Sequence, residues 1–185
     1  MKRAATFLVC VIALVTMLAA QSLTARVDRD QLHIAASGLH FLTGEALNRL
    51  RDGATVVYEL QLTARADKAG SVIARTLERF AVSYDLWEEK FAITKLGSSP
   101  RSVSHLSAAA AEAWCVENTS IPVGGLAANE PFWLRLDYRA DSEPQDNSGF
   151  TLSGLIDIFS RRPRSEQVHG SGEVGPLRLE NLRKK

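Results

Sequence analysis

The chain has 185 residues, 45% of them hydrophobic and 23% charged, and a formal net charge of +1. This composition fits one domain with one hydrophobic core. Without an N-terminal leader that holds Lys2 and Arg3, 20 of the 22 basic residues remain against 21 acidic ones. The chain therefore lacks the strong positive field that recruits nucleic acid, and we expect no nucleic-acid partner.

The N-terminus has the pattern of an export signal. Lys2 and Arg3 precede an apolar run over residues 4–20, which polar residues then end. Cleavage after Ala20 places the large Leu18 three positions back, whereas cleavage after Ser22 places the small Ala20 there and fits better. Residues 1–22 are a signal peptide by this interpretation. The alternative is an uncleaved inner-membrane anchor, because a run of this length is close to the ~17–25 residues that span a bilayer. We expect an exported, periplasmic protein, or one anchored in the inner membrane by residues 4–20.

Residues 27–185 are expected to form a single α+β domain. Residues 30–36 are predicted as a first strand and residues 43–53 as a short helix. Residues 55–65 alternate between apolar and polar, which is typical of a half-buried strand. A turn follows, and the next strand runs from Val72 to about Asp85. Its predicted inward residues are Val72, Ala74, Phe80, Val82 and Tyr84.

The register of this region follows from the apolar pattern. A hairpin centred on Ala69 places Tyr58 opposite Phe80 and Val56 opposite Val82. A second reversal at Trp87–Glu88 starts a third strand. It places Tyr84 opposite Phe91, Val82 opposite Ile93 and Asp85 opposite Lys90. A slip of one residue would turn Phe91 and Ile93 to the other face, so residues 54–96 are predicted as a three-stranded antiparallel meander.

Further elements complete the predicted domain. The longest helix is expected to begin after a cap at Ser102 or Ser104 and to end near Glu117. Its predicted inward stripe is Val103, Leu106, Ala110, Ala113 and Trp114. A loop is predicted over 119–130, a strand over 132–139, a short helix over 152–159, an irregular segment over 165–176 and an edge strand over 177–182. The expected fold is an antiparallel sheet of about five or six strands with packed helices.

The acidic turn of residues 85–89 is the first candidate site. Asp85, Glu88 and Glu89 can bind a cation or act as an acid pair, or they form only a solvated turn. We favour the turn, because exposed carboxylates lack the burial that tunes a catalytic pKa. Leu86 and Trp87 are different, since a simple turn does not require them. If they are exposed, they are candidate partner contacts.

A second candidate is the segment of residues 155–164, which is apolar and then basic. Ile158, Phe159, Arg161 and Arg162 can contact an anionic membrane surface or a partner. The alternative is a helix packed on the sheet with a solvated basic end. We favour this alternative.

No catalytic, cofactor or metal site is predicted. Residues 170–175, GSGEVG, match G-x-G-x-x-G, but Pro176 follows where a dinucleotide site needs a helix, so a loop is favoured. The four histidines lack the short spacing of a metal motif. Cys115, the one cysteine after the leader, excludes an internal disulfide and is predicted to be a small buried side chain.

The order of several segments resembles domain-of-unknown-function family 4390, a family of exported bacterial proteins. The resemblance rests on VVYELQL, RTLERFAVSYDLWEEKFAI, the Ala-rich helix, FWLRLDY, FTLSGLIDIFSRRPRSE and GPLRLENL. It implies a bacterial envelope location and an unassigned activity. It also suggests a genomic context near a nitrogen-responsive sensor kinase, and it supplies no functional residues.

Three hypotheses about function follow. The first is a non-enzymatic binding or interaction module whose partner is a protein or small ligand of the envelope. The second is an enzyme with scattered residues, which requires a pocket that gathers titratable groups from distant segments. The third is a membrane-tethered partner of an envelope sensor system.

Overall fold

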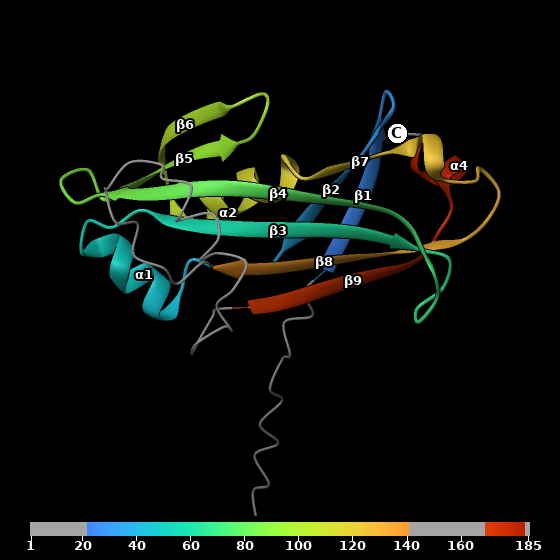
Figure 1. The fold of residues 1–185 in the computed structure, drawn as a ribbon, viewed down its shortest axis with the longest axis horizontal. Helices are drawn as coiled ribbons and strands as arrows, with labels where there is room; N and C mark the ends of the chain where they lie inside the picture. Colours follow the sequence, from blue (N-terminus) through green and yellow to red (C-terminus); the bar gives the residue numbers. More distant parts are fainter. Residues whose placement is uncertain (1–21, 141–168, 184–185) are drawn as a thin grey trace, which may run out of the picture.

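The computed structural model describes residues 22–140 and 169–183. In this part the chain is an α+β fold with two antiparallel sheets, one of six strands in the order β6-β5-β4-β3-β8-β9 and one of three in the order β1-β2-β7. The smaller sheet crosses behind the larger one at a steep angle (Figure 1). The predicted helix at 152–159 lies outside the described residues.

The predicted meander is confirmed. It consists of β3 (Val56–Arg65), β4 (Val72–Asp85) and β5 (Lys90–Leu96). Tyr58 pairs with Phe80 and Tyr84 with Phe91, as the apolar pattern requires. One predicted inward residue is wrong. Val72 is exposed, because a β-bulge after Ala64 moves Val72 opposite Arg65 and so to the other face.

Two further strands extend the large sheet beyond β3. The predicted strand at 132–139 is confirmed as β8 (Phe132–Ala140), which pairs with β3. The segment predicted as irregular is instead β9 (His169–Leu177), which pairs with β8. The predicted final edge strand is also wrong, because this stretch holds the short helix α4 (Leu179–Leu182).

Glycine accounts for the unrecognised strand β9. A Cβ at Gly170 would collide with the Tyr138 ring, and one at Gly175 would come within 2.6 Å of the Trp133 ring. These glycines let β9 lie close against large side chains of β8. Glycine has a low strand propensity, and for this reason the segment was predicted to be irregular.

The smaller sheet contains the predicted strand 30–36 as β2 (Gln31–Ser37). Its two neighbours were not predicted. β1 (Ser22–Asp28) pairs with β2 along its whole length and begins before residue 27, and β7 (Ser120–Pro122) lies within the segment predicted as a loop. A 3-10 turn, η1 (Val123–Gly125), follows β7.

The predicted long helix is wrong in its first half. Residues 101–106 form the edge strand β6 (Arg101–Leu106), and the helix α2 (Ala108–Glu117) starts at a cap on Ser107, whose Oγ accepts the N–H of Ala110. The error has a physical cause. Val103 pairs with Ile93 and Leu106 with Phe91, so a β-bulge places residues three apart on one face, which imitates helical spacing.

The two longer helices, α1 and α2, contact the sheets. The predicted helix at 43–53 is confirmed as α1 (Gly44–Arg51), which packs on β3 and β4 through Ala46 and Leu50. α2 lies against β2 and β5. Its buried residues are not the predicted alanines, since Ala110 and Ala113 are exposed. The residues buried on α2 are Ala111, Glu112, Cys115 and Val116.

Candidate functional site

The β4–β5 turn is closed by a carboxylate. Asp85 Oδ1 accepts the backbone N–H groups of Trp87 at 2.8 Å and of Glu88 at 3.0 Å. These hydrogen bonds hold the pKa of Asp85 below its ordinary value, because they stabilise the charged form. Asp85 pairs with Lys90 in the ladder, as predicted. The side chain of Asp85 thus serves the turn.

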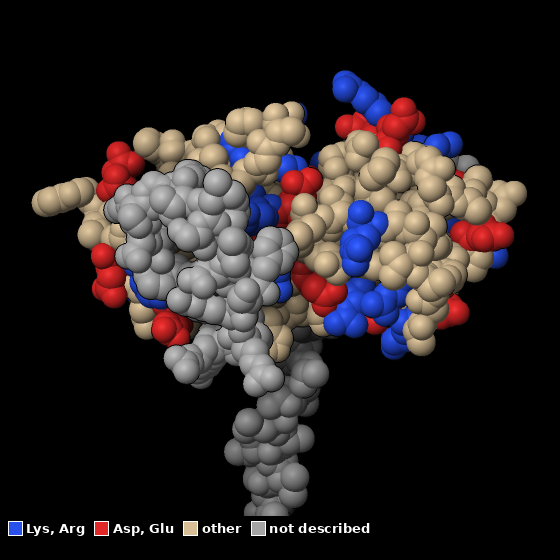
Figure 2. Space-filling view, viewed as in Figure 1, with Lys and Arg blue, Asp and Glu red and all other residues tan. Residues whose placement is uncertain are grey.

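The side chains of Leu86 and Trp87 are not the groups that close this turn. Trp87 is 96% exposed and Leu86 is 58% exposed. Figure 2 shows uncharged atoms projecting from the end of the molecule where the β4–β5 hairpin ends in Figure 1, with acidic atoms on either side. We call the residues Asp85–Glu89 the hairpin tip. The hairpin tip exposes the indole ring of Trp87 to solvent.

One side chain of strand β6 contacts the hairpin tip. His105, near the end of β6, places Nδ1 at 3.3 Å from a carboxylate oxygen of Glu88. Both side chains are more than half exposed, so the contact contributes little to stability. In the described part of the chain, no three side chains of His, Cys, Asp or Glu gather as a metal site would require.

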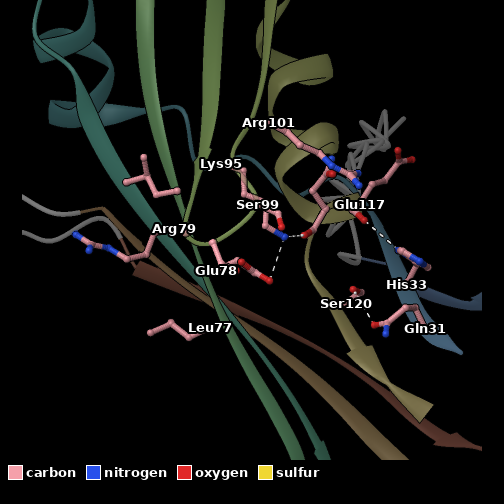
Figure 3. A pocket seen from close by; sticks show the side chains of 14 residues that line it. Gln31, His33, Leu77, Glu78, Arg79, Lys95, Ser99, Arg101, Glu117 and Ser120 are labelled. Carbon is pink, nitrogen blue, oxygen red and sulfur yellow. Dashed lines mark hydrogen bonds and ion pairs between the residues drawn. The ribbon is translucent and has the colours of Figure 1, made fainter. Parts of the chain in front are cut away.

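A polar cleft of about 640 Å³ is the second candidate. It lies where the large sheet meets the small one, and four separate regions of the chain line it. Figure 3 shows Glu78 and Lys95 pointing toward Ser120 and Gln31. Arg79 and Leu77 point away from Ser120 and Gln31. Sequence motifs did not reveal the cleft, because its residues meet only through the packing of the sheets.

Hydrogen bonds across the cleft join its walls. Lys95 Nζ lies 3.0 Å from Glu78 Oε1 and donates to the carbonyl oxygen of Asn118 at 2.8 Å. His33 Nδ1 lies 3.2 Å from the carbonyl oxygen of Glu117. These polar groups already have hydrogen-bond partners within the cleft. They therefore hold the large sheet and the small sheet together in this structure.

The third candidate is a carboxylate in the hydrophobic core. Glu112 is buried on α2, and its Oε1 accepts the N–H groups of Phe41 at 2.7 Å and Leu42 at 2.8 Å. Its Oε2 lies 3.0 Å from His40 Nδ1. No sequence pattern indicated this role, because the acid lies within an Ala-rich helix. Glu112 fastens the segment before α1 to α2.

Burial near Glu112 makes two further groups unreactive. It raises the pKa of the Tyr58 hydroxyl, whose oxygen has no hydrogen-bond partner among the described residues, and the charge of Glu112 raises it further. Burial likewise raises the pKa of the Cys115 thiol, with the same second cause. A protonated, fully buried thiol is a poor nucleophile. The prediction that Cys115 is a small buried side chain is confirmed.

The other sequence candidates have varied outcomes. The GSGEVG segment lies inside β9, so its glycines do not form the turn between a strand and a helix, and the predicted loop is wrong. Ile158, Phe159, Arg161 and Arg162 lie outside the described residues. Within the described ranges, no helix has the length and apolar character needed to cross a membrane.

Comparisons with protein-family models, with curated proteins and with solved structures found no match to this chain.

Proposed function

We propose that the chain is an exported protein of the bacterial envelope that acts as a non-enzymatic interaction module. The observation that supports this most directly is the exposure of Trp87 at the hairpin tip. A tryptophan costs little conformational entropy to immobilise and buries a large area when bound, which is why it is enriched at interaction hot spots. Its turn is closed by Asp85 and needs no indole.

The charges of the hairpin tip narrow the kind of partner. Asp85, Glu88 and Glu89 surround the exposed apolar pair, and among the described residues Glu88 contacts His105. Acidic groups are repelled by an anionic membrane surface. The tip therefore fits a protein pocket with an apolar base and a basic rim better than it fits a lipid surface.

A pull-down from envelope extracts tests this function. The tagged chain is compared with a variant that carries Leu86→Ala and Trp87→Ala. We expect a reproducible partner with the unchanged chain and its loss with the variant, while the melting temperature stays the same. A partner recovered equally by both, or no reproducible partner, would contradict the proposal.

An enzyme is the second candidate, and the cleft is the observation that favours it. His33, Glu78 and Lys95 come from distant parts of the chain and line one cavity, which is the arrangement an enzyme without a sequence motif requires. Screening the chain and a Glu78→Gln variant against hydrolase substrates tests it. An activity that the variant lacks would favour this candidate.

The family resemblance also supports a membrane-tethered role beside an envelope sensor system, in which residues 4–20 stay attached. N-terminal sequencing of the envelope protein tests the tether. A mature chain that begins near Gln21 or Leu23 would remove it.

A further inference from the structure

In the described part of the chain, half of strand β4 has no hydrogen-bonded strand on one side, although β7 lies close to β4. β4 is 14 residues long, but β5 pairs with it only from Arg79 to Asp85. β3 covers the opposite side down to Val72. Among the described residues, the stretch Val72–Glu78 thus has a strand partner on one side only. We call this stretch the free edge of β4.

The free edge carries open hydrogen-bonding positions. In an antiparallel ladder, alternate residues direct their N–H and C=O groups toward opposite neighbours, so part of this backbone faces away from β3. No turn or loop backbone group of the described chain bonds to Val72–Glu78. An unpaired edge is a template for another strand, and proteins usually protect it with charge or a covering element.

The side chains of the free edge are unusually apolar for a surface. Five large hydrophobic residues are exposed in the described part of the chain, and Leu86 and Trp87 at the hairpin tip are two of them. The other three lie on the free edge, namely Val72, Ile73 and Leu77, which is 51% exposed. Such a concentration on one strand is typical of an interaction surface.

Arg75 supplies the charge of this surface. It lies between the exposed apolar residues and is itself exposed, and it forms no ion pair within the described residues. By contrast, Arg79, four residues further along the same face, is paired with Glu59 at 3.4 Å. The free edge therefore presents one unbalanced positive charge among apolar side chains.

The free edge also leads into the cleft. Leu77 and Glu78 line the cleft together with Leu96 and Gly97, where β5 ends. Gly97 has a φ of +130°, a conformation that favours glycine, and it turns the chain away from β4 toward β6. A strand placed beside the free edge would lie in line with β5 and would begin at the cleft (Figure 1, Figure 3).

We propose that the free edge of β4 binds an extended segment of a partner protein by strand addition. The segment carries an acidic side chain next to Arg75 and apolar side chains next to Val72 and Leu77. Backbone pairing gives the affinity in this mode, and the alternating side chains give the specificity. The inference deepens the proposed interaction function, and it uses a surface separate from the hairpin tip.

A second copy of the chain fits this edge less well. The antiparallel self-pairing that uses the whole of Val72–Glu78 places Arg75 opposite the Arg75 of the other copy. Like charges directly opposite one another destabilise a ladder. An acidic residue at that position in a different protein converts the repulsion into an attraction.

The test uses the chain recovered from the envelope fraction and a displayed library of random peptides of about twelve residues, long enough to form one strand. Enriched peptides are synthesised, and their affinity and their effect on amide hydrogen exchange are measured. We expect an acid flanked by apolar residues in the enriched set. We also expect slower exchange in Val72–Glu78 when peptide is bound.

Charge reversal provides the matched control. Arg75→Glu is expected to weaken the peptide at least about tenfold, and a peptide with Lys in place of its acid is expected to bind the variant again. Trp87→Ala should leave peptide affinity unchanged, which separates this surface from the hairpin tip. If Trp87→Ala abolishes partner capture from extracts while peptide binding persists, both surfaces function independently.

Three results would overturn the inference. The first is an absence of enriched peptides, and the second is binding that leaves exchange in Val72–Glu78 unchanged. The third is self-association of the chain that protects the same amides without peptide, because the occupant is then a second copy. Failure of the hairpin tip to capture a partner, while peptide binding at Val72–Glu78 persists, would contradict only the proposed function.

Discussion

The backbone N–H of Trp87 donates a hydrogen bond of 2.8 Å to the side chain of Asp85, while the indole of the same residue is exposed. The turn is thus fixed by one residue and the projecting surface is supplied by the other. This separation makes the two roles independently testable. A change at Asp85 should affect the shape of the turn, and a change at Trp87 should affect what the turn contacts.

The protonation of Asp85 gives the first prediction. Because its folded-state pKa lies below the ordinary value near 3.9, its contribution to stability is fully present above that value and is lost as the pH falls through the folded-state pKa. Titration of the Asp85 carboxyl followed by NMR should give a depressed pKa. Asp85→Asn should remove this part of the pH dependence. A pKa at or above 3.9 contradicts the observed hydrogen bonds.

The buried Glu112 gives the second prediction. Glu112→Ala leaves the N–H groups of Phe41 and Leu42 buried without acceptors, and we expect a loss of about 2–5 kcal/mol in the free energy of unfolding. Glu112→Gln is the matched control, since one amide oxygen can still accept both bonds. Chemical denaturation of the two variants measures the difference. Equal losses would show that the backbone contacts do not matter.

Strand β4 itself gives the third prediction. Phe80 is fully buried and pairs with Tyr58, so Phe80→Ala should cost about 3–5 kcal/mol. Leu77, three residues earlier, is half exposed, and Leu77→Ala should change stability by no more than about 0.5 kcal/mol. Urea unfolding followed by circular dichroism compares them. A large loss for Leu77→Ala would mean that the free edge of β4 is covered.

The cleft gives the fourth prediction. Lys95 contacts both Glu78 and the carbonyl oxygen of Asn118, and so it connects the large sheet to the region that joins α2 and β7. A double-mutant cycle of Lys95→Met and Glu78→Gln should give a coupling of roughly 1 kcal/mol, because both side chains are mostly buried. Zero coupling would mean that the pair does not persist in solution.

Cys115 gives the fifth prediction. The buried thiol, with its raised pKa, should resist alkylation at pH 8 in the folded chain and react readily in denaturant. Mass spectrometry of the peptide that contains Cys115 measures this without interference from Cys10. Rapid alkylation under native conditions would indicate that α2 opens easily.

The meander could be predicted from sequence because apolar residues alternate with other residues over 56–62, 80–84 and 91–93. Tyr84 with Phe91 and Tyr58 with Phe80 left one register, and the structure has that register. Where a bulge interrupts the alternation, prediction failed. Val103 and Leu106 imitated a helix, and Val72 was assigned to the wrong face.

The candidate sites differ in the same way. The hairpin tip could be located because its residues are consecutive, although its exposure could not be known from the sequence. The cleft, the bonds of Glu112 and the free edge of β4 depend on contacts between segments far apart in the chain or on where β5 ends. No spacing within a single segment encodes those contacts.

The interaction proposed for the hairpin tip can be measured in cells that produce the chain. A photo-crosslinking amino acid is placed at position 87, with the same substitution at Ala113 as the control. Ala113 is also exposed, on α2, and belongs to neither proposed surface. We expect a discrete crosslinked protein from position 87 and none from position 113. The same products from both positions, or no product from position 87, would contradict the proposed interaction.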